Sequence, residues 1–258
     1  MDLKIKGRRA LVLGGNRGMG LAIAEALAAE GAVLAIAARD QAASAEAVAR
    51  LGPGAMAFPL DLDDTSGLDG FAAEVAEQFG APEILVNNTG GPAYGGALGR
   101  DPADWDSAFR GMVLSIIRLT DLFLPAMRAA GWGRVLTVVS TGAVQPIPVL
   151  GISNTLRAGV IAWSKTLAGE VATQGITVNC LMPGRVGTER VHLTDAAAAA
   201  REGVDVAIIR ARSHASIPMG RYAEPAEIAA AAAFAVSGCA SYMTGAVLRV
   251  DGGIVRHV

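Results

Sequence analysis

The sequence contains little cysteine and few aromatic residues: 2 of its 258 residues are Cys, and 5% are Phe, Trp or Tyr. The spacing of Cys180 and Cys239 fits neither a disulfide framework nor a zinc or redox motif. We therefore expect both to be small, buried hydrophobic residues, with a reactive thiol as the less favoured alternative.

Long apolar runs and a strong excess of charge are also absent. The longest uninterrupted apolar run, Ile228 to Val236, has nine residues, whereas a membrane-spanning helix needs about 20. The mean hydropathy of +0.40 is therefore attributed to alanine-rich helices. A net charge of −2 gives no general electrostatic reason to bind nucleic acid or an anionic membrane. The first residues do not form a signal peptide, so we expect a cytoplasmic protein.

What the sequence does contain is a regular alternation of apolar runs and helical periodicity. The predicted strands are 10–13, 33–38, 55–60, 84–86, 134–139, 176–181 and 246–250. The predicted helices are 19–30, 41–51, 66–79, 101–112, 113–130, 150–174 and 224–236. Apolar strands separated by helices indicate an α/β fold, a Rossmann-type doubly wound parallel sheet of about seven strands. No linker or repeat divides the chain, so we expect a single domain over residues 1–258.

Residues 189–216 interrupt this alternation. The segment places basic side chains in an alanine-rich helical background: Arg190, His192, Arg201, Arg210, Arg212 and His214. Because it lies between the sixth strand and the last helix, we interpret it as a mobile lid over a substrate pocket. A solvated, charged pair of helices is the alternative.

A glycine-rich turn separates the first predicted strand from the first predicted helix. Glycines there permit a tight turn and let the backbone approach a pyrophosphate, and the N–H groups at the start of the helix attract phosphate oxygens. The strand before and the helix after make this a dinucleotide site rather than an ordinary turn. The residues predicted to bind the cofactor here are Gly14, Asn16, Arg17, Gly18, Met19 and Gly20.

This turn and several later motifs resemble the short-chain dehydrogenases/reductases, and the sequence is identified as a member of that family. The matching segments are Asp61-Leu62, Asn87-Asn88-Thr89-Gly90, Pro183-Gly184 followed by Thr188, and Asp251-Gly252-Gly253. The resemblance implies that Asp61 and Leu62 contact adenine, and that Asn87 and Gly90 line the cofactor. It also implies that Pro183, Gly184 and Thr188 hold the nicotinamide carboxamide. Family members are commonly dimers or tetramers, so we expect a homo-oligomer, either a dimer or a homotetramer, built partly from segments 113–124 and 156–167.

The end of the second strand predicts which nicotinamide cofactor binds. NAD-preferring sites place Asp or Glu there to accept a hydrogen bond from the ribose 2′-hydroxyl. Here Ala38 replaces the acid, and Arg39 offers a planar donor to a 2′-phosphate. Arg17 adds a second positive charge, although Asp40 lies one position later. We predict NADP(H); two ordinary surface arginines are the alternative.

The catalytic pattern departs from the family. The resemblance implies an Asn, Ser, Tyr and Lys set, of which only Ser140 is present. Ser153 stands at the tyrosine position, Arg157 at the lysine position and Met112 at the asparagine position. The sequence therefore carries Ser-x-x-x-Arg where the family has Tyr-x-x-x-Lys.

This replacement changes the proton chemistry. Tyrosine has a pKa near 10 that a neighbouring lysine lowers, whereas a serine hydroxyl is a far weaker acid. Arg157 can hold the nicotinamide ribose or stabilise an oxyanion but will not exchange a proton near neutral pH, and Ser140 can donate to a substrate carbonyl. Other proton sources are Tyr94, His192, His214 or water relayed through Ser140 and Ser153. Ser153 and Arg157 can instead be purely structural.

Three functions remain open. The first is an NADP(H)-dependent oxidoreductase acting on a small-molecule carbonyl or alcohol. The second is a nucleotide-binding protein with little catalysis. The third, a lyase resembling the halohydrin dehalogenases, is disfavoured because those enzymes keep the tyrosine and lose the glycine turn. Arg185 and Arg190 hint at an anionic or polar substrate, although solvent exposure explains them equally well.

Overall fold

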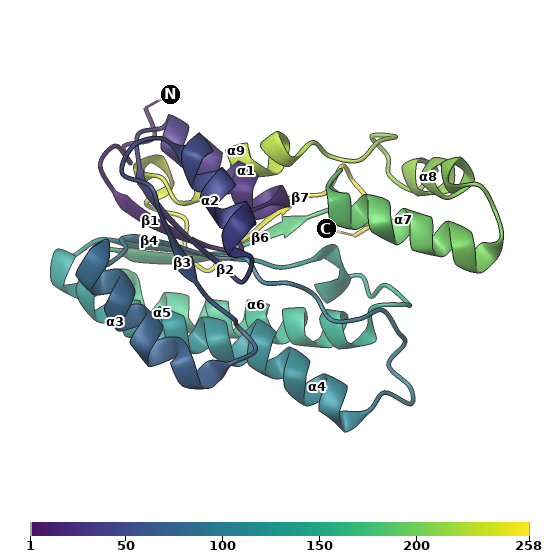
Figure 1. Cartoon of the computed structure of the whole chain (residues 1–258), viewed down its shortest axis with the longest axis horizontal. Coiled ribbons are helices and arrows are strands. Elements are labelled where there is room, and N and C mark those ends of the chain that lie inside the picture. Colours follow the sequence, from purple (N-terminus) through teal and green to yellow (C-terminus); the bar gives the residue numbers. More distant parts are fainter. Residues whose placement is uncertain (1, 258) are drawn as a thin grey trace.

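The computed structural model describes residues 2–257 and contains one seven-stranded parallel sheet, in the order β3-β2-β1-β4-β5-β6-β7 (Figure 1). Its strands are β1 (Arg9–Leu13), β2 (Val33–Ala38), β3 (Met56–Pro59), β4 (Ile84–Asn87), β5 (Gly133–Val138), β6 (Ile176–Pro183) and β7 (Val247–Val250). Strand order reverses between β1 and β4, as a doubly wound sheet requires. The predicted Rossmann-type fold is confirmed.

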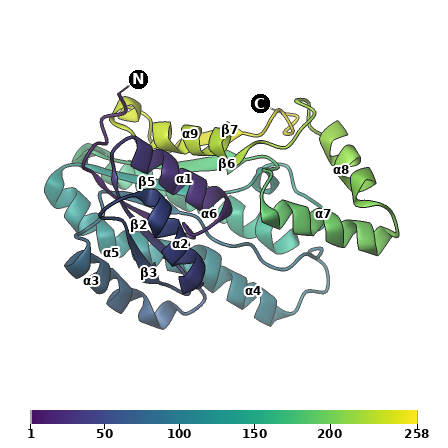
Figure 2. The same cartoon turned by 45° about the horizontal axis from the view of Figure 1, so that its top comes forward.

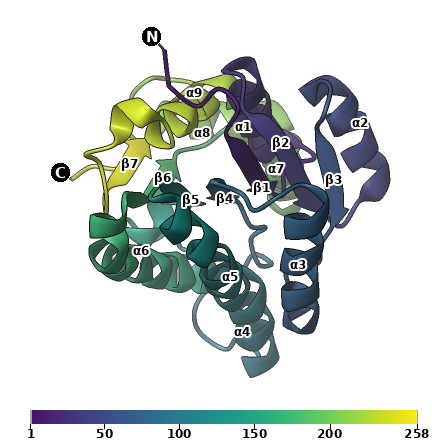
Figure 3. The ribbon, with the colours of Figure 1, turned by 90° about the vertical axis from the view of Figure 1, so that its left-hand side faces the viewer.

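Helices cover both faces of the sheet (Figure 3). One face carries α1 (Gly18–Ala29), α2 (Gln41–Leu51) and α9 (Pro225–Ala235). The other carries α3 (Leu68–Gln78), α4 (Pro102–Phe109), α5 (Ser115–Ala130) and α6 (Gly151–Val171). Short 3-10 turns are η1 (Thr65–Gly67), η3 (Thr141–Ala143), η4 (Ala172–Gln174) and η5 (Gly238–Ala240).

The central strands are mostly apolar because both of their faces are buried. In β1, Leu11 and Leu13 join the hydrophobic cluster under α3, α5 and α6, whereas Ala10 and Val12 join the cluster under α1 and α9. Side chains of a strand alternate between faces, so a strand covered on both sides is apolar at most of its positions. Four alanines of α9 are buried against this core: Ala229, Ala232, Ala233 and Ala235. Across residues 2–257, no helix combines the length and apolar character needed to cross a bilayer.

The predicted helices 101–112 and 113–130 are joined in the structure by a π-helical segment, η2 (Arg110–Leu114). Gly111 lies in it, where an added Cβ would be 2.0 Å from Oδ1 of Asp63. Met112, at the family asparagine position, is also in this segment and is buried. Such π-helical turns often occur at functional sites. The segment is therefore of functional interest even though the Met112 side chain is apolar.

Segment 189–216 forms two helices, α7 (Glu189–Glu202) and α8 (Val206–Ala215). They project beyond the carboxyl ends of the strands (Figures 1 and 2). A buried Asp195 on α7 fixes them: its carboxylate accepts from Arg185 at 2.7 Å and from the Tyr222 hydroxyl at 2.8 Å. The His214 ring of α8 packs edge-on against Tyr222. The helical character was predicted, and the mobility of this segment stays a prediction.

The prediction for the cysteines is half right. Cys180 is buried in β6, and burial raises the pKa of its thiol. Cys239 is exposed, so the prediction that it is buried was wrong. It lies in η5, a surface turn after α9, where the apolar pattern of the preceding helix no longer applies.

We expect Asp195→Ala to lower the free energy of unfolding by about 3 kcal/mol or more, because it leaves the Arg185 charge and the Tyr222 hydroxyl without their buried partner. The matched control is Glu202→Ala on the same helix, whose ion pair with Arg212 is exposed and is expected to contribute about 0–1 kcal/mol. Urea denaturation measures both. Equal effects of the two substitutions would contradict the anchoring role of Asp195.

Candidate functional site

The candidate site lies at the carboxyl edge of the sheet, where β1 and β4 are neighbours. Open α/β sheets bind ligands at this point because the chain leaves adjacent strands in opposite directions and opens a crevice. The glycine turn follows β1, the Asn88–Gly91 loop follows β4, Ser140 follows β5 and the Thr188 loop follows β6. The structure therefore brings the predicted cofactor and catalytic segments to one edge.

The glycine turn is held by the loop after β4. The Asn88 side chain donates to the Gly14 carbonyl oxygen at 3.3 Å. An added Cβ on Gly20 would lie 2.0 Å from that same oxygen, so only glycine fits there. Helix α1 has no side-chain cap at its N-terminal residue Arg17 and no acidic residue in its first turn. Its N–H groups and the positive end of the helix dipole thus remain available to an anion.

The loops after β6 and β7 close the other side of this turn. Thr188 lies opposite Gly18, where an added Cβ would be 3.7 Å from the Thr188 methyl carbon. Gly184 donates its N–H to the Val250 carbonyl oxygen at 2.9 Å, directly after Pro183 ends β6. These contacts place the predicted carboxamide-binding loop beside the predicted diphosphate-binding turn.

Two arginines lie at the end of the crevice where adenosine is predicted to bind. Arg17 and Arg39 are both exposed. Arg39 is 4.0 Å from the Asp63 carboxylate, and both side chains are largely exposed, at 70% and 57%, so this ion pair is weak. Asp40 is occupied as the cap of α2, where its carboxylate accepts from the Ala43 N–H. The Asp40 side chain therefore does not take the place of the missing acid at Ala38.

Four further predicted cofactor-binding residues differ in exposure. Asn16 is buried and donates its amide to the Asp40 carbonyl oxygen at 3.3 Å. Asp61 is exposed and accepts from the Asp63 N–H, Leu62 packs partly against the core, and Met19 is half-buried. All four follow the carboxyl ends of strands; the contacts of Asp61 and Leu62 with adenine, and those of Asn16 and Met19 with the cofactor, stay predictions.

The motif after β4 divides into inner and outer residues. Asn87 is fully buried and donates to the hydroxyls of Thr120 and Thr137, both at 3.3 Å. Gly90 is exposed. Asn88 rather than Asn87 is the residue that reaches the glycine turn. The Thr89 hydroxyl oxygen is buried and has no hydrogen-bond partner within residues 2–257.

Arg157 is a buried cation at the base of the crevice. It is only 8% exposed, and its guanidinium donates to the carbonyl oxygens of Val138, Thr89 and Gly90. Burial, with a smaller effect of the positive charge of Arg190, lowers the pKa of Arg157 to about 10. The side chain therefore stays protonated near neutral pH. It brings a fixed positive charge to the ends of β4 and β5.

Ser140 and Ser153 lie near Arg157. The Ser140 oxygen accepts from the Gly142 N–H at 3.1 Å, which leaves its own proton free to donate. Ser153 is 7% exposed, and its hydroxyl forms no hydrogen bond with any residue from 2 to 257. It is one helical turn before Arg157 on α6. Asn154 packs beside Gly142, which brings the start of α6 to the end of β5.

The other predicted proton sources are placed differently. Tyr94 is 46% exposed, and its hydroxyl is 2.7 Å from that of Thr194 on α7. His192 is exposed, and His214 packs on Tyr222. The link from Tyr94 to Thr194 ties the loop after β4 to α7. Sequence reasoning missed it because the two residues are a hundred positions apart with no shared pattern.

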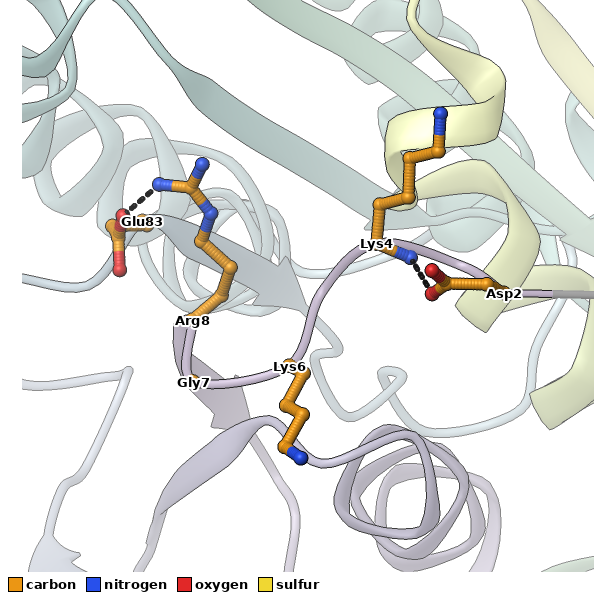
Figure 4. A pocket seen from close by; sticks show the side chains of 6 residues that line it. All are labelled: Asp2, Lys4, Lys6, Gly7, Arg8 and Glu83. Carbon is orange, nitrogen blue, oxygen red and sulfur yellow. Dashed lines mark hydrogen bonds and ion pairs between the residues drawn. The ribbon is translucent and has the colours of Figure 1, made fainter.

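A depression of about 630 Å³ lies at the opposite edge of the sheet (Figure 4). Its lining precedes β1 and β4 and consists of Asp2, Lys4, Lys6, Gly7, Arg8 and Glu83. Arg8 is paired with Glu83, and the side chains of Lys4 and Lys6 point away from each other. The cations do not converge, so this depression is not the candidate site. Among the described residues, no cluster of His, Cys, Asp or Glu is arranged to hold a metal ion.

Comparison with known proteins agrees with this geometry. Residues 14–255 match the family model described as enoyl-(acyl carrier protein) reductase. The chain is 34% identical to nodulation protein G of Azospirillum brasilense, over 95% of this chain and 97% of the relative. It is 32% identical to a 3-oxoacyl-(acyl-carrier-protein) reductase of Vibrio cholerae, over 98% of this chain and 99% of the relative.

The chain belongs to the short-chain dehydrogenase/reductase family. A solved L-sorbose reductase from Gluconobacter frateurii, in complex with NADPH and L-sorbose, has the same fold with a TM-score of 0.95. The L-sorbose reductase and this short-chain dehydrogenase/reductase are 32% identical, and the match covers 100% of each chain. The family identification made from the sequence motifs is confirmed.

We expect Thr89→Val to stabilise the nucleotide-free protein by about 1 kcal/mol, because it removes a buried hydroxyl without a partner while keeping the shape of the side chain. Thr89→Ser, which keeps the hydroxyl, is the control and should give no such gain. The midpoint of urea unfolding measures both. A Thr89→Val protein less stable than wild type would show that the hydroxyl has a stabilising partner.

Proposed function

We propose that this short-chain dehydrogenase/reductase is an NADP(H)-dependent oxidoreductase that acts on a carbonyl or alcohol with an altered catalytic set. The observation that carries the proposal is the uncapped start of α1 beside the exposed Arg17 and Arg39. This arrangement suits both a diphosphate and a ribose 2′-phosphate. The NADPH in the similarly folded L-sorbose reductase supports the choice of cofactor.

The residues present fit an NADP(H) molecule along the crevice. The turn from Gly14 to Gly20 would hold the diphosphate, and Arg17 and Arg39 would hold the 2′-phosphate. Asp61 and Leu62 would lie at adenine, and the loop from Pro183 to Thr188 at the carboxamide. When bound, the nicotinamide supplies or accepts the hydride.

Ser140 and Arg157 would act on the oxygen of the reacting carbonyl. Ser140 has a hydroxyl proton free to donate, since its oxygen already accepts from Gly142. Arg157 remains protonated near neutral pH and adds positive charge where negative charge develops. It is therefore an electrostatic stabiliser rather than a proton source.

The proton would come from water relayed by Ser140 and Ser153. The Ser153 hydroxyl has no partner among the described side chains and lies one turn from Arg157, so it is available to a water molecule. Tyr94 is a second candidate, since its loop is bonded to the start of α6 through Gly95 and Gly151. Both routes supply the proton that the missing family tyrosine would supply.

A nucleotide-binding protein with little catalysis is the second candidate function. The replacement of tyrosine and lysine by Ser153 and Arg157 favours it. Tight NADPH binding without turnover on any carbonyl compound would establish it in place of the oxidoreductase. The intact glycine turn disfavours the dehalogenase-like lyase.

We also propose that the protein forms a homodimer or homotetramer and is cytoplasmic. Residues 189–216 would form a lid over the substrate. Exposed Phe109 and Leu114 on the long α4–α5 rod support an interface there. Both side chains would be covered by a second copy of the chain.

We expect Arg39→Ala to weaken NADPH binding by about 10- to 100-fold and to leave NADH binding unchanged, because a charged hydrogen bond to the 2′-phosphate is lost. Arg50→Ala, on α2 beside Glu25, is the control for a lost surface charge. Calorimetric titration with both nucleotides measures the effect. An equal loss of affinity for NADPH and NADH would rule out 2′-phosphate recognition by Arg39.

We expect Ser140→Ala to lower kcat by about 100-fold or more at unchanged NADPH affinity, as for loss of a donor to a developing oxyanion. Arg157→Met should lower kcat similarly, and Arg157→Lys should recover part of it because the charge returns. A panel containing L-sorbose and acetoacetyl thioesters, followed by NADPH absorbance, measures turnover. Wild-type kcat in Ser140→Ala would remove Ser140 from the chemistry.

A further inference from the structure

Two guanidinium groups from different helices meet one short segment, Thr89–Gly91, after β4. Arg157 of α6 donates to the carbonyl oxygens of Thr89 and Gly90, at 3.4 and 3.1 Å. Arg190 of α7 reaches Gly91, where an added Cβ would lie only 2.8 Å from its terminal nitrogen. Glycine at position 91 therefore leaves room for Arg190 to lie on the loop.

Neither of these arginines has a carboxylate partner. Over residues 2–257, no ion pair involves Arg157 or Arg190, and the Arg190 side chain makes no hydrogen bond. Other arginines at this end of the molecule are neutralised in the pairs Arg185–Asp195, Arg100–Asp104 and Arg221–Glu227. Two positive charges close together, one of them buried, are unfavourable without an anion. No carboxylate among residues 2–257 pairs with either of these two arginines.

The pair lies at the substrate end of the crevice. Arg190 is in the first turn of α7, two residues after Thr188, and Gly91 follows the motif at the end of β4. Arg17 and Arg39, by contrast, follow β1 and β2. The nicotinamide carries no negative charge, so the cofactor's reactive end would not neutralise the two arginines.

We propose that Arg190 binds an anionic group of the substrate, a carboxylate or a phosphate, with Arg157 as a second positive charge behind it. A planar guanidinium binds either group through two parallel N–H···O bonds. Three carbonyl oxygens already accept from Arg157, whereas the donors of Arg190 are free. The substrate is then an oxo acid or a phosphorylated ketone, or its alcohol. This inference rests on the proposed oxidoreductase function and names its substrate class.

The test compares matched charged and neutral carbonyl compounds: acetoacetate with methyl acetoacetate, and dihydroxyacetone phosphate with dihydroxyacetone. We expect wild type to prefer one charged member by about 10- to 100-fold in kcat/KM, as for a charged hydrogen bond. Arg190→Gln should abolish the preference by raising KM for the charged member, and kcat/KM for the charged member should fall more than kcat/KM for the neutral member. Arg201→Gln, at the far end of α7 and about 16 Å along the helix, is the matched control and should behave as wild type.

Binding separates this inference from the proposed function. Calorimetry of the NADPH-bound protein with succinate and with glycerol 3-phosphate reports anion binding without turnover, and Arg190→Gln should abolish it. Anion binding that depends on Arg190 without turnover of any compound would support the anion site and overturn the oxidoreductase. Turnover of neutral compounds with no charge preference would overturn the anion site alone. Weaker NADPH binding by Arg190→Gln, measured without substrate, would indicate that Arg190 binds the cofactor phosphates. That result would also overturn the substrate anion site.

Discussion

The close approach of the glycine turn to the loop after β4 is the contact on which the rest of the site depends. Asn88 donates to Gly14, and Gly20 has no room for a side chain against the same carbonyl oxygen. This contact seats the start of α1 at the carboxyl edge, between the ends of β1 and β4. The two loops that the proposal assigns to the diphosphate and to the substrate therefore lie in contact.

Arginine organises the charge of this crevice. Arg17 and Arg39 lie at the adenosine end, and Arg157 and Arg190 meet at the other end, on the loop after β4. The family set of tyrosine and lysine combines a proton donor with a cation. Here the cation is retained as arginine, and in the proposed mechanism hydroxyls and water deliver the proton. Such a site stabilises negative charge well and moves protons less directly, a division that follows from the chemistry of guanidinium and hydroxyl groups.

Much of the fold could be predicted from the sequence because its signals are local. The apolar run of β1, the glycine turn and the helical periodicity of α1 each depend on neighbouring residues. The exposure of Cys239 could not be predicted in this way, since it depends on where η5 lies on the surface. The partners of Asp195 and Tyr94 come from distant segments and carry no shared spacing. The meeting of Arg157 and Arg190 could not be predicted for the same reason. The two arginines are far apart in the sequence, and only the fold brings both to the loop after β4.

The central claim is that the turn from Gly14 to Gly20 binds the diphosphate of NADP(H), with arginine at the 2′-phosphate. A crystal structure of the protein with NADPH tests it most directly. The account predicts diphosphate oxygens within hydrogen-bond distance of the N–H groups at the start of α1, and the 2′-phosphate beside Arg39. Nucleotide bound elsewhere, or a 2′-phosphate directed away from Arg17 and Arg39, would contradict it.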